Sequence, residues 1–186
     1  MEVEEILLEC EERMDKTIEH LGKELRGIRT GRANTALVEY IKVDYYGAPT
    51  DIRELAGVSV VESTTLMIKP FDPAAKNEII KAIESSDLGL NPQSDGNTIR
   101  ISIPSPTKER RMQLVGQVKK LGEDSKVAIR NERRDANKSL DSAQSEQKLS
   151  DDEIKGAKES VDDLTKAHNA EIEALVTKKT KEIEDI

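Results

Sequence analysis

Apolar residues recur in steps of three and four near the start of the chain. They occupy positions 3, 7, 10, 14, 21, 25 and 28, and Thr17 and Ile18 share the one position that is missing from the series. This spacing predicts an amphipathic helix over residues 2–29 that packs through a narrow seam, as helices in coiled coils do. Thr30-Gly31 is expected to end this helix.

The pattern changes between Ala33 and Pro104. Short runs rich in Val, Ile, Tyr and Thr predict strands over residues 40–46, 58–61, 65–69 and 98–103, with turn-forming residues between them. One helix interrupts the strands, because Asp72 suits the N-cap and Pro73 the first helical position. It is expected to end near Gly89, which can adopt the left-handed conformation that follows many helices. The segment therefore predicts a small α+β domain.

Helical periodicity resumes after Pro106. A second helix is expected from Thr107 to about residue 144, with a seam that is weak near its middle, and Ser150-Asp151-Asp152-Glu153 is a capping box that opens a third helix. The predicted fold class is α+β: an elongated antiparallel three-helix bundle (residues 1–30 and 106–186) carrying an inserted β/α domain (residues 31–105). Two adjacent connections predict a hinge and a bent, L-shaped molecule. The predicted hinge residues are Thr30, Gly31, Pro104, Ser105 and Pro106, within segments 30–32 and 104–106.

The composition favours helices packed along narrow apolar stripes. Apolar residues make up 35% of the chain and charged residues 35%, and the aromatic residues are limited to three Tyr and one Phe. A single cysteine, Cys10, excludes an internal disulfide framework and fits a reducing compartment; its seam position indicates a core residue. The acidic start has no apolar stretch behind it, so we expect a soluble, cytoplasmic protein that does not bind membranes.

The sequence contains no pattern typical of catalysis or metal binding. His20 and His168 lie in different predicted helices, with no Cys, His or carboxylate at ligand spacing. The glycines are isolated in turns rather than gathered in a phosphate-binding loop, and no nucleophile elbow is present. We therefore expect no enzyme activity, no metal and no cofactor, and we interpret His168 as a packing or edge residue.

One stretch of the second predicted helix is basic, although the chain is acidic. Between Lys119 and Lys138, seven basic and four acidic side chains give a net charge of +3, whereas the whole chain carries −8. The spacing of Arg130, Arg133 and Arg134 places all three on one helix face. The simpler interpretation is a solvated face with ion pairs inside the helix, and the other is a binding surface.

A second cationic group lies near the predicted hinge, and the start of the second helix lies about 35 Å from Arg130 along that helix. It contains Arg26, Arg29, Arg32, Arg110 and Arg111. Guanidinium groups spread over this length suit the phosphates of a large folded RNA, because arginine binds phosphate oxygens bidentately. The sequence has no row of stacking aromatic residues and no zinc knuckle, which favours recognition of RNA shape and backbone over sequence readout.

Five segments resemble the bacterial ribosome recycling factor family. They are Arg13-Met14-Asp15-Lys16, residues 28–33 (IRTGRA), Tyr45-Tyr46-Gly47 with Pro49-Thr50, residues 87–92 (DLGLNP) and residues 130–137 (RNERRDAN). They occur in the family's order across essentially the whole chain, so the combination is far more specific than any one segment. The resemblance implies a three-helix bundle with an inserted β/α domain and a tRNA-like L shape.

The resemblance also implies a function. Family members bind the post-termination ribosome across the A and P sites and, with elongation factor G and GTP hydrolysis, help to split the subunits and free mRNA and tRNA. The factor itself hydrolyses nothing. The family's bundle lies on large-subunit ribosomal RNA, which implies RNA contacts first at Arg130 and Arg133, and then at Arg29, Arg32, Arg111 and Arg134.

The inserted domain of the family swings about the hinge, where elongation factor G pushes it, and we expect this chain to be a monomer. The alternative function is a structural or chaperone-like helical bundle whose basic face is merely solvated. Two residues depart from the family pattern. Glu132 replaces an apolar residue, which would loosen packing or offset local positive charge, and Pro106 replaces Leu, which would stiffen one hinge connection.

Overall fold

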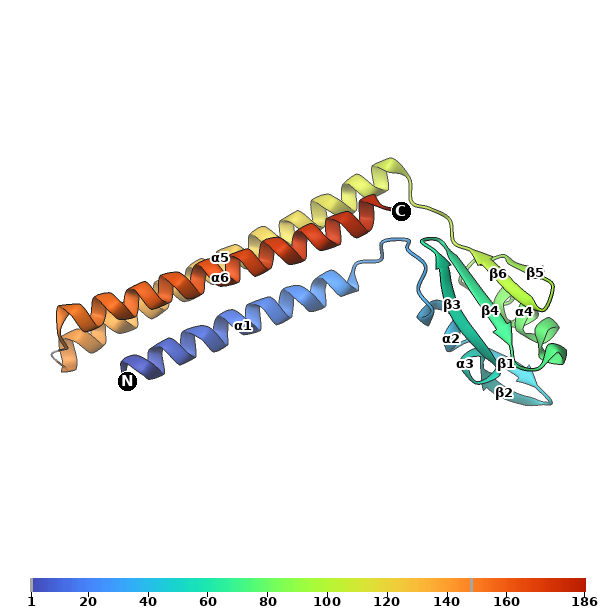
Figure 1. Cartoon of the computed structure of the whole chain (residues 1–186), viewed down its shortest axis with the longest axis horizontal. Coiled ribbons are helices and arrows are strands. Elements are labelled where there is room, and N and C mark those ends of the chain that lie inside the picture. Colours follow the sequence, from blue (N-terminus) through green and yellow to red (C-terminus); the bar gives the residue numbers. More distant parts are fainter. Residues whose placement is uncertain (1, 148) are drawn as a thin grey trace. The chain divides into compact units, whose positions relative to one another are not determined.

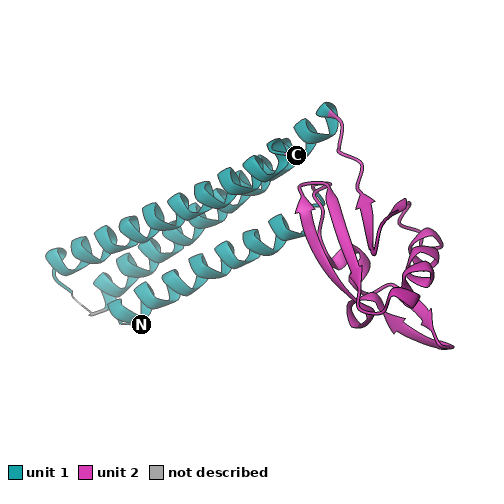
Figure 2. Cartoon of the chain, turned by 45° about the vertical axis from the view of Figure 1, so that its right-hand side comes forward, with its two compact units in different colours: residues 1–29, 108–185 teal, residues 30–107, 186 magenta. Residues whose placement is uncertain are grey.

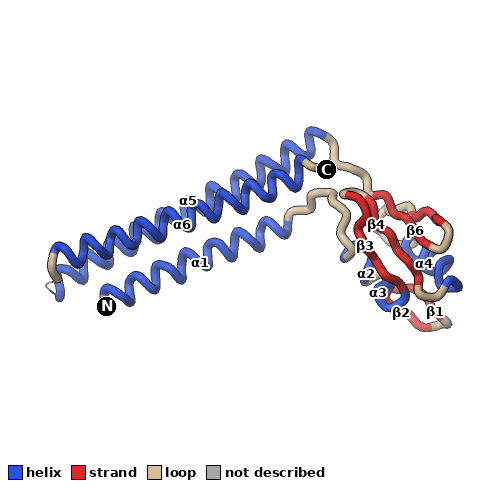
Figure 3. Tube along the Cα trace, viewed as in Figure 1, coloured by secondary structure: helices blue, strands red, loops and turns tan. Residues whose placement is uncertain are grey.

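The computed structural model describes residues 2–147 and 149–186, and these form two compact units. The helical unit consists of the N-terminal segment up to Arg29 together with Lys108–Asp185, and the sheet unit consists of Thr30–Thr107 (Figure 2). The sheet unit is therefore inserted between two parts of the helical unit. Figure 3 shows the division of structure types, with long helices in one unit and all the strands drawn in the other.

The helical unit contains three long helices: α1 (Val3–Gly27), α5 (Lys108–Gln147) and α6 (Asp151–Glu184). Helix α5 runs antiparallel to α1 and α6, and each helix contacts the other two (Figure 1). The predicted capping box opens α6: the backbone N–H of Glu153 donates to Ser150 Oγ at 3.3 Å, and Glu153 Oε2 accepts from the Ser150 backbone N–H at 3.0 Å. At 40 residues, α5 spans about 60 Å.

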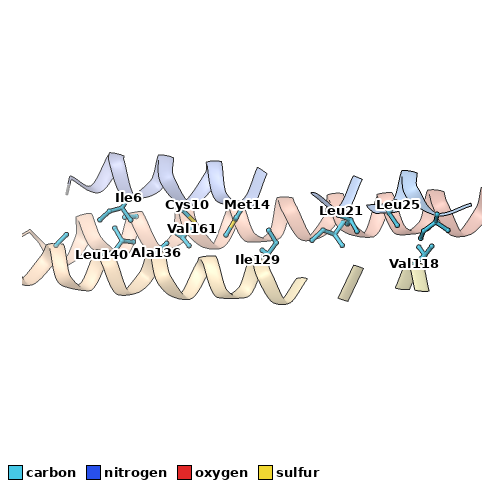
Figure 4. Close-up of a cluster of buried hydrophobic side chains, with 14 of the residues drawn as sticks. Ile6, Cys10, Met14, Leu21, Leu25, Val118, Ile129, Ala136, Leu140 and Val161 are labelled. Carbon is cyan, nitrogen blue, oxygen red and sulfur yellow. The ribbon is translucent and has the colours of Figure 1, made fainter. Parts of the chain in front are cut away.

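The core of the helical unit is one continuous seam. Side chains such as Met14 and Leu21 on α1, Ile129 on α5 and Val161 on α6 meet along the bundle axis (Figure 4). The predicted seam of the first helix omitted Ile6, which is buried, and Ile129 is buried near the middle of α5, where the seam was predicted to be weak. Because α5 contacts two helices rather than one, it needs a wider apolar face than a two-helix seam, and Ile129 widens that face.

The sheet unit has a four-stranded antiparallel sheet and a separate hairpin. The strand order is β3 (Ala56–Glu62), β4 (Thr65–Pro70), β6 (Thr98–Ser102) and β5 (Pro92–Asp95), and the hairpin pairs β1 (Lys42–Tyr45) with β2 (Ala48–Asp51). Short helices α2 (Ala36–Glu39) and α3 (Ile52–Leu55) and the longer α4 (Lys76–Glu84) complete the unit. Isoleucines from β4, β6 and α4 fill its core, for example Ile68, Ile79 and Ile99.

Several predicted boundaries were wrong. Helix α1 ends at Gly27, before Thr30-Gly31, and α4 ends at Glu84, so Gly89 takes its left-handed conformation (φ +63°) in a later turn and not at the helix end. The predicted strand over residues 40–46 is shorter in the structure: β1 covers Lys42–Tyr45, and Tyr40 is the C-cap of α2. Strands β2 and β5 were missed because each contains a proline and few β-branched residues, which weakens the local signal for a strand.

The two chain segments that were predicted to form the hinge enter the sheet unit side by side. The Ala33 backbone N–H donates to the Ser63 carbonyl oxygen and the Ile103 N–H to the Thr64 carbonyl oxygen, each at 2.7 Å, so both segments are fixed at the turn between β3 and β4. Gly31 has φ +80°, and a Cβ there would lie 3.0 Å from the Pro106 ring. Only glycine fits this approach without strain.

Candidate nucleic-acid interface

Arg130, Arg133 and Arg134 form an exposed basic face on α5, which we call the arginine face. Their spacing places them within about one helical turn, as predicted. Within residues 2–147 and 149–186, Arg130 and Arg134 make no ion pair, and Arg133 makes one long contact, from Nη1 to Asp162 Oδ1 of α6 at 3.7 Å. The face is therefore not the network of ion pairs within one helix that a purely solvated surface would show.

The arginine face is built on a rigid base. Ile129 and Ala136 belong to the same turns of α5 as the three arginines, and both are buried in the core of the helical unit. Burial of these neighbours fixes the rotation of α5 about its axis. The three guanidinium groups therefore project from a fixed backbone, which lowers the entropy cost of binding an extended ligand.

Glu132 lies within the arginine stretch but turns away from the arginine face. Its carboxylate Oε2 is 3.5 Å from Arg13 Nη1 on α1, and the side chain retains only 25% of its exposure. Arg13 also pairs with Glu9 on its own helix, and hydrogen bonds to Glu9 and then to Glu132 raise the pKa of Arg13. Glu132 thus pairs across the seam, with a cation from another helix, and leaves the arginines of its own helix unneutralised.

Arg13-Met14-Asp15 connects α1 to both partner helices, a role that the sequence did not reveal. Arg13 reaches α5, Met14 is fully buried, and Asp15 Oδ1 lies 3.0 Å from Nε2 of His168 on α6. Burial of the His168 ring opposes its charge, but hydrogen bonds to Asp15 and to the Leu164 carbonyl oxygen outweigh burial and raise its pKa. His168 is therefore a packing residue with a structural partner, as interpreted from its seam position.

The remaining predicted arginines are not gathered with the arginine face. Arg29 ends the first segment of the helical unit, Arg32 belongs to the sheet unit, and Arg111 lies in the first turns of α5, about 28 Å along the helix from Arg130. Arg29 and Arg32 are exposed, whereas Arg111 is half-buried and has an interaction partner. Within the helical unit, a surface that uses both Arg111 and Arg130 must therefore extend along about 28 Å of α5.

Other kinds of site were searched for in the described part of the chain. No group of three or more His, Cys, Asp or Glu residues there is arranged to hold a metal ion. Burial, followed by the nearby Glu132 carboxylate, raises the pKa of the Cys10 thiol, which keeps it in its unreactive protonated form at neutral pH. Among the same described residues, none of the helices combines the length and the apolarity that crossing a lipid bilayer requires.

Comparisons with known proteins agree with the resemblance seen in the sequence. The family model described as "Ribosome recycling factor" matches residues 21–183. A ribosome-recycling factor of Geobacillus sp. (strain WCH70) is 47% identical over 184 residues, covering 99% of this chain and 100% of the relative. One from Oleidesulfovibrio alaskensis is 49% identical over 181 residues, covering 97% and 98%.

Solved structures give the same result. A solution structure of ribosome recycling factor has a TM-score of 0.67 at 40% identity and covers 100% of this chain and 99% of that one. A second structure comes from models of the T. thermophilus ribosome recycling factor and the E. coli elongation factor G bound to the E. coli post-termination complex. Its recycling factor has a TM-score of 0.60 at 41% identity and covers 98% of this chain and 99% of that one. These matches confirm the predicted α+β fold class, and over essentially its full length the chain belongs to the ribosome recycling factor family.

Proposed function

We propose that this chain binds the post-termination ribosome and, with elongation factor G and GTP, promotes subunit dissociation and the release of mRNA and tRNA. Full-length membership of the family supports this function, as does the structural relative that is bound with elongation factor G to a post-termination complex. The chain is a cytoplasmic factor and not an enzyme. The alternative, a purely structural or chaperone-like bundle, has no comparable support.

The arginine face is the surface through which the helical unit contacts large-subunit ribosomal RNA in this proposal. The observation that carries it is the lack of intramolecular neutralisation: Arg130 and Arg134 have no ion-pair partner in the described segments, and Arg133 has only the long contact to Asp162. Two unpaired guanidinium groups and a third with one long contact, all on one rigid face, suit phosphate oxygens. The net charge of −8 repels RNA outside the basic patches, so the face orients the bound molecule.

Arg29, Arg32 and Arg111 would add contacts to the same RNA away from the arginine face. Arg29 and Arg32 are exposed and flank Gly31, so an RNA strand can reach both. Arg111 is half-buried, so its guanidinium has less freedom to meet a phosphate. We rank these three behind Arg130 and Arg133 for that reason, with Arg134 between the two groups.

The segments 30–32 and 104–106 form the hinge in this proposal. The hydrogen bonds of Ala33 and Ile103 to the turn between β3 and β4 mark where the fixed backbone of the sheet unit begins. Between these bonds and the long helices, the residues from Thr30 to Arg32 and from Pro104 to Pro106 belong to no helix or strand. Pro104 and Pro106 stiffen the second connection, so the first connection, through Gly31, absorbs most of the rotation.

A subunit-splitting assay tests the function. Model post-termination complexes are incubated with the chain, elongation factor G and GTP, and the separation of subunits is followed by light scattering. Splitting is expected to exceed the level reached with elongation factor G alone, and Arg130→Ala with Arg133→Ala should reduce it. Lys155→Ala, which removes an exposed cation from α6, is the matched control. Splitting at the level of elongation factor G alone would refute the proposal.

A further inference from the structure

A second surface of the helical unit has properties opposite to those of the arginine face. A groove of about 620 Å³ lies between α1 and α6. Its floor is apolar and includes Leu7 and Leu164, both of which pack against the core of the helical unit. We call it the α1–α6 groove. Because its floor continues the core, its shape is as fixed as the core itself.

The edges of the α1–α6 groove are acidic. Glu4, Glu11 and Asp163 border it, and none of the side chains that line it is basic; Asp163 also pairs with Lys166 of its own helix at 3.4 Å, an exposed contact that is weak. Leu8 stands at the edge on α1 and is 58% exposed, although it lies beside the buried seam. A single exposed leucine is ordinary, but an exposed leucine that extends an apolar groove forms a patch of the kind that marks interaction sites.

Helix α6 separates this groove from the arginine face. Asp162 faces α5, where it contacts Arg133, and the next residue, Asp163, borders the groove on the side of α1. Successive residues of a helix point about 100° apart, which accounts for the two directions. The helical unit can therefore hold an anionic ligand at one surface and a different partner at the other.

We propose that the α1–α6 groove binds a basic, amphipathic protein segment. Apolar side chains of the segment would lie against Leu7, Leu8 and Leu164, and its Lys or Arg side chains would pair with the carboxylates at the edges, as in other cases where a helix binds in a groove. Charge selects this occupant. The carboxylates repel RNA phosphates, anionic lipid and a second copy of this chain, whose net charge is −8. The inference does not depend on the proposed recycling function.

A designed peptide tests the proposal. The probe is a fluorescent 14-residue peptide of Leu and Lys, with leucines at helical spacings i, i+3, i+4 and i+7, and the reference peptide has the same composition in an order that has no apolar face. Fluorescence anisotropy with the full chain at physiological salt should give a Kd at least about tenfold lower for the patterned peptide, because only that peptide buries leucines in the groove.

Variants of the groove separate apolar docking from simple charge attraction. Leu8→Glu adds a carboxylate but removes an apolar contact, so it should raise the Kd about tenfold if docking is apolar. Glu11→Gln combined with Asp163→Asn should raise it about threefold. Glu12→Gln is the matched control, because Glu12 is exposed on α1 outside the groove, and it should leave the Kd unchanged.

Three results would overturn the proposal. The first is equal affinity for the two peptides, and the second is unchanged or tighter binding by Leu8→Glu. Either result would show that the peptide is attracted by surface carboxylates alone and does not dock in the groove. The third is self-association of the chain in sedimentation that Leu8→Glu abolishes, which would assign the groove to a second copy. Leu8→Ser, which introduces no charge, replaces Leu8→Glu if the latter lowers the melting temperature.

Discussion

Charged residues serve opposite purposes at the seam of α1 and at the arginine face of α5. At the seam, Arg13 and Asp15 each meet a partner on another helix, Glu132 and His168 respectively. At the face, Arg130 and Arg134 have no ion-pair partner within the described residues. Pairing a charge across a helix interface fixes the bundle, whereas leaving it unpaired on a rigid surface keeps it available for a ligand. Substitutions at the two regions should therefore change different measurements.

Truncation in the seam should produce the largest effect on stability. Met14 is fully buried between the two paired residues, so Met14→Ala leaves a cavity and should lower the free energy of unfolding by about 3 kcal/mol. Urea denaturation followed by circular dichroism measures the change. Met112→Ala, at an exposed position of α5, is the control and should change the stability by less than about 0.5 kcal/mol.

The same Met14→Ala variant should bind the large ribosomal subunit normally once corrected for the folded fraction. A loss of affinity greater than that fraction explains would mean that the seam and the arginine face are coupled. In that case the seam would contribute to ribosome binding as well as to stability.

Substitutions at the arginine face should have the reverse effect. Arg130→Ala with Arg133→Ala should weaken binding to the large subunit by more than about tenfold, because two bidentate phosphate contacts are lost. The slope of the logarithm of the binding constant against the logarithm of salt concentration should fall by about one unit per arginine. The melting temperature should stay nearly unchanged, since neither side chain supports the core. A double variant that binds normally, or that unfolds, would show that the arginine face is structural.

The pair formed by Asp15 and His168 should make the stability of the seam depend on pH. The pKa of His168 is raised above its ordinary value of 6.5 in the folded state. The charged ring is therefore favoured by folding, and its contribution is fully present below pH about 6.5 and is lost as the pH rises through the folded-state pKa. Urea denaturation at pH 5.5, 7 and 9 should show this loss.

Asp15→Asn should flatten that pH dependence, because the amide cannot favour the imidazolium as a carboxylate does. Glu171, which also favours the charged ring, is retained in this variant. The chain has two histidines, so the His20→Gln background leaves His168 as the remaining one and isolates its contribution. If the stability of Asp15→Asn depends on pH as that of the unsubstituted chain does, the contact between Asp15 and His168 does not stabilise the seam.

Local signals in the sequence were sufficient to predict some features. The capping box at Ser150 needs only residues 150–153, and the spacing of Arg130, Arg133 and Arg134 places them on one face of any helix. Features that depend on neighbouring elements could not be predicted in the same way. The partner of Glu132, Arg13, lies 119 residues away on α1, and no local sequence pattern predicts this pairing.

The sheet unit illustrates the same limit. Strand β5 starts at Pro92 and its ladder partner is β6, so tertiary pairing forms a strand that Pro-Gln-Ser-Asp alone does not favour. Tyr46 adopts φ +51° at the tip of the β1–β2 hairpin, next to Gly47 at φ +83°, although the predicted strand over residues 40–46 included Tyr46. The hairpin fixes this turn, because a two-residue connection of type I′ requires positive φ at both positions.

Asp162 provides the most sensitive test of the comparison between seam and face, although its expected effect is the smallest. It is the one described partner of Arg133 and is half-exposed, so the ion pair is weak and competes with a phosphate only slightly. Asp162→Asn should therefore strengthen binding to the large subunit by about two- to threefold, measured in parallel with Asp163→Asn. The control removes the same charge from the next residue, whose described partner is Lys166 on the same helix rather than an arginine of α5.

If both variants strengthen binding equally, the gain comes from net charge. If only Asp162→Asn does so, Arg133 exchanges a carboxylate for a phosphate when the chain binds, and the arginine face is held in part by a contact that the ligand replaces.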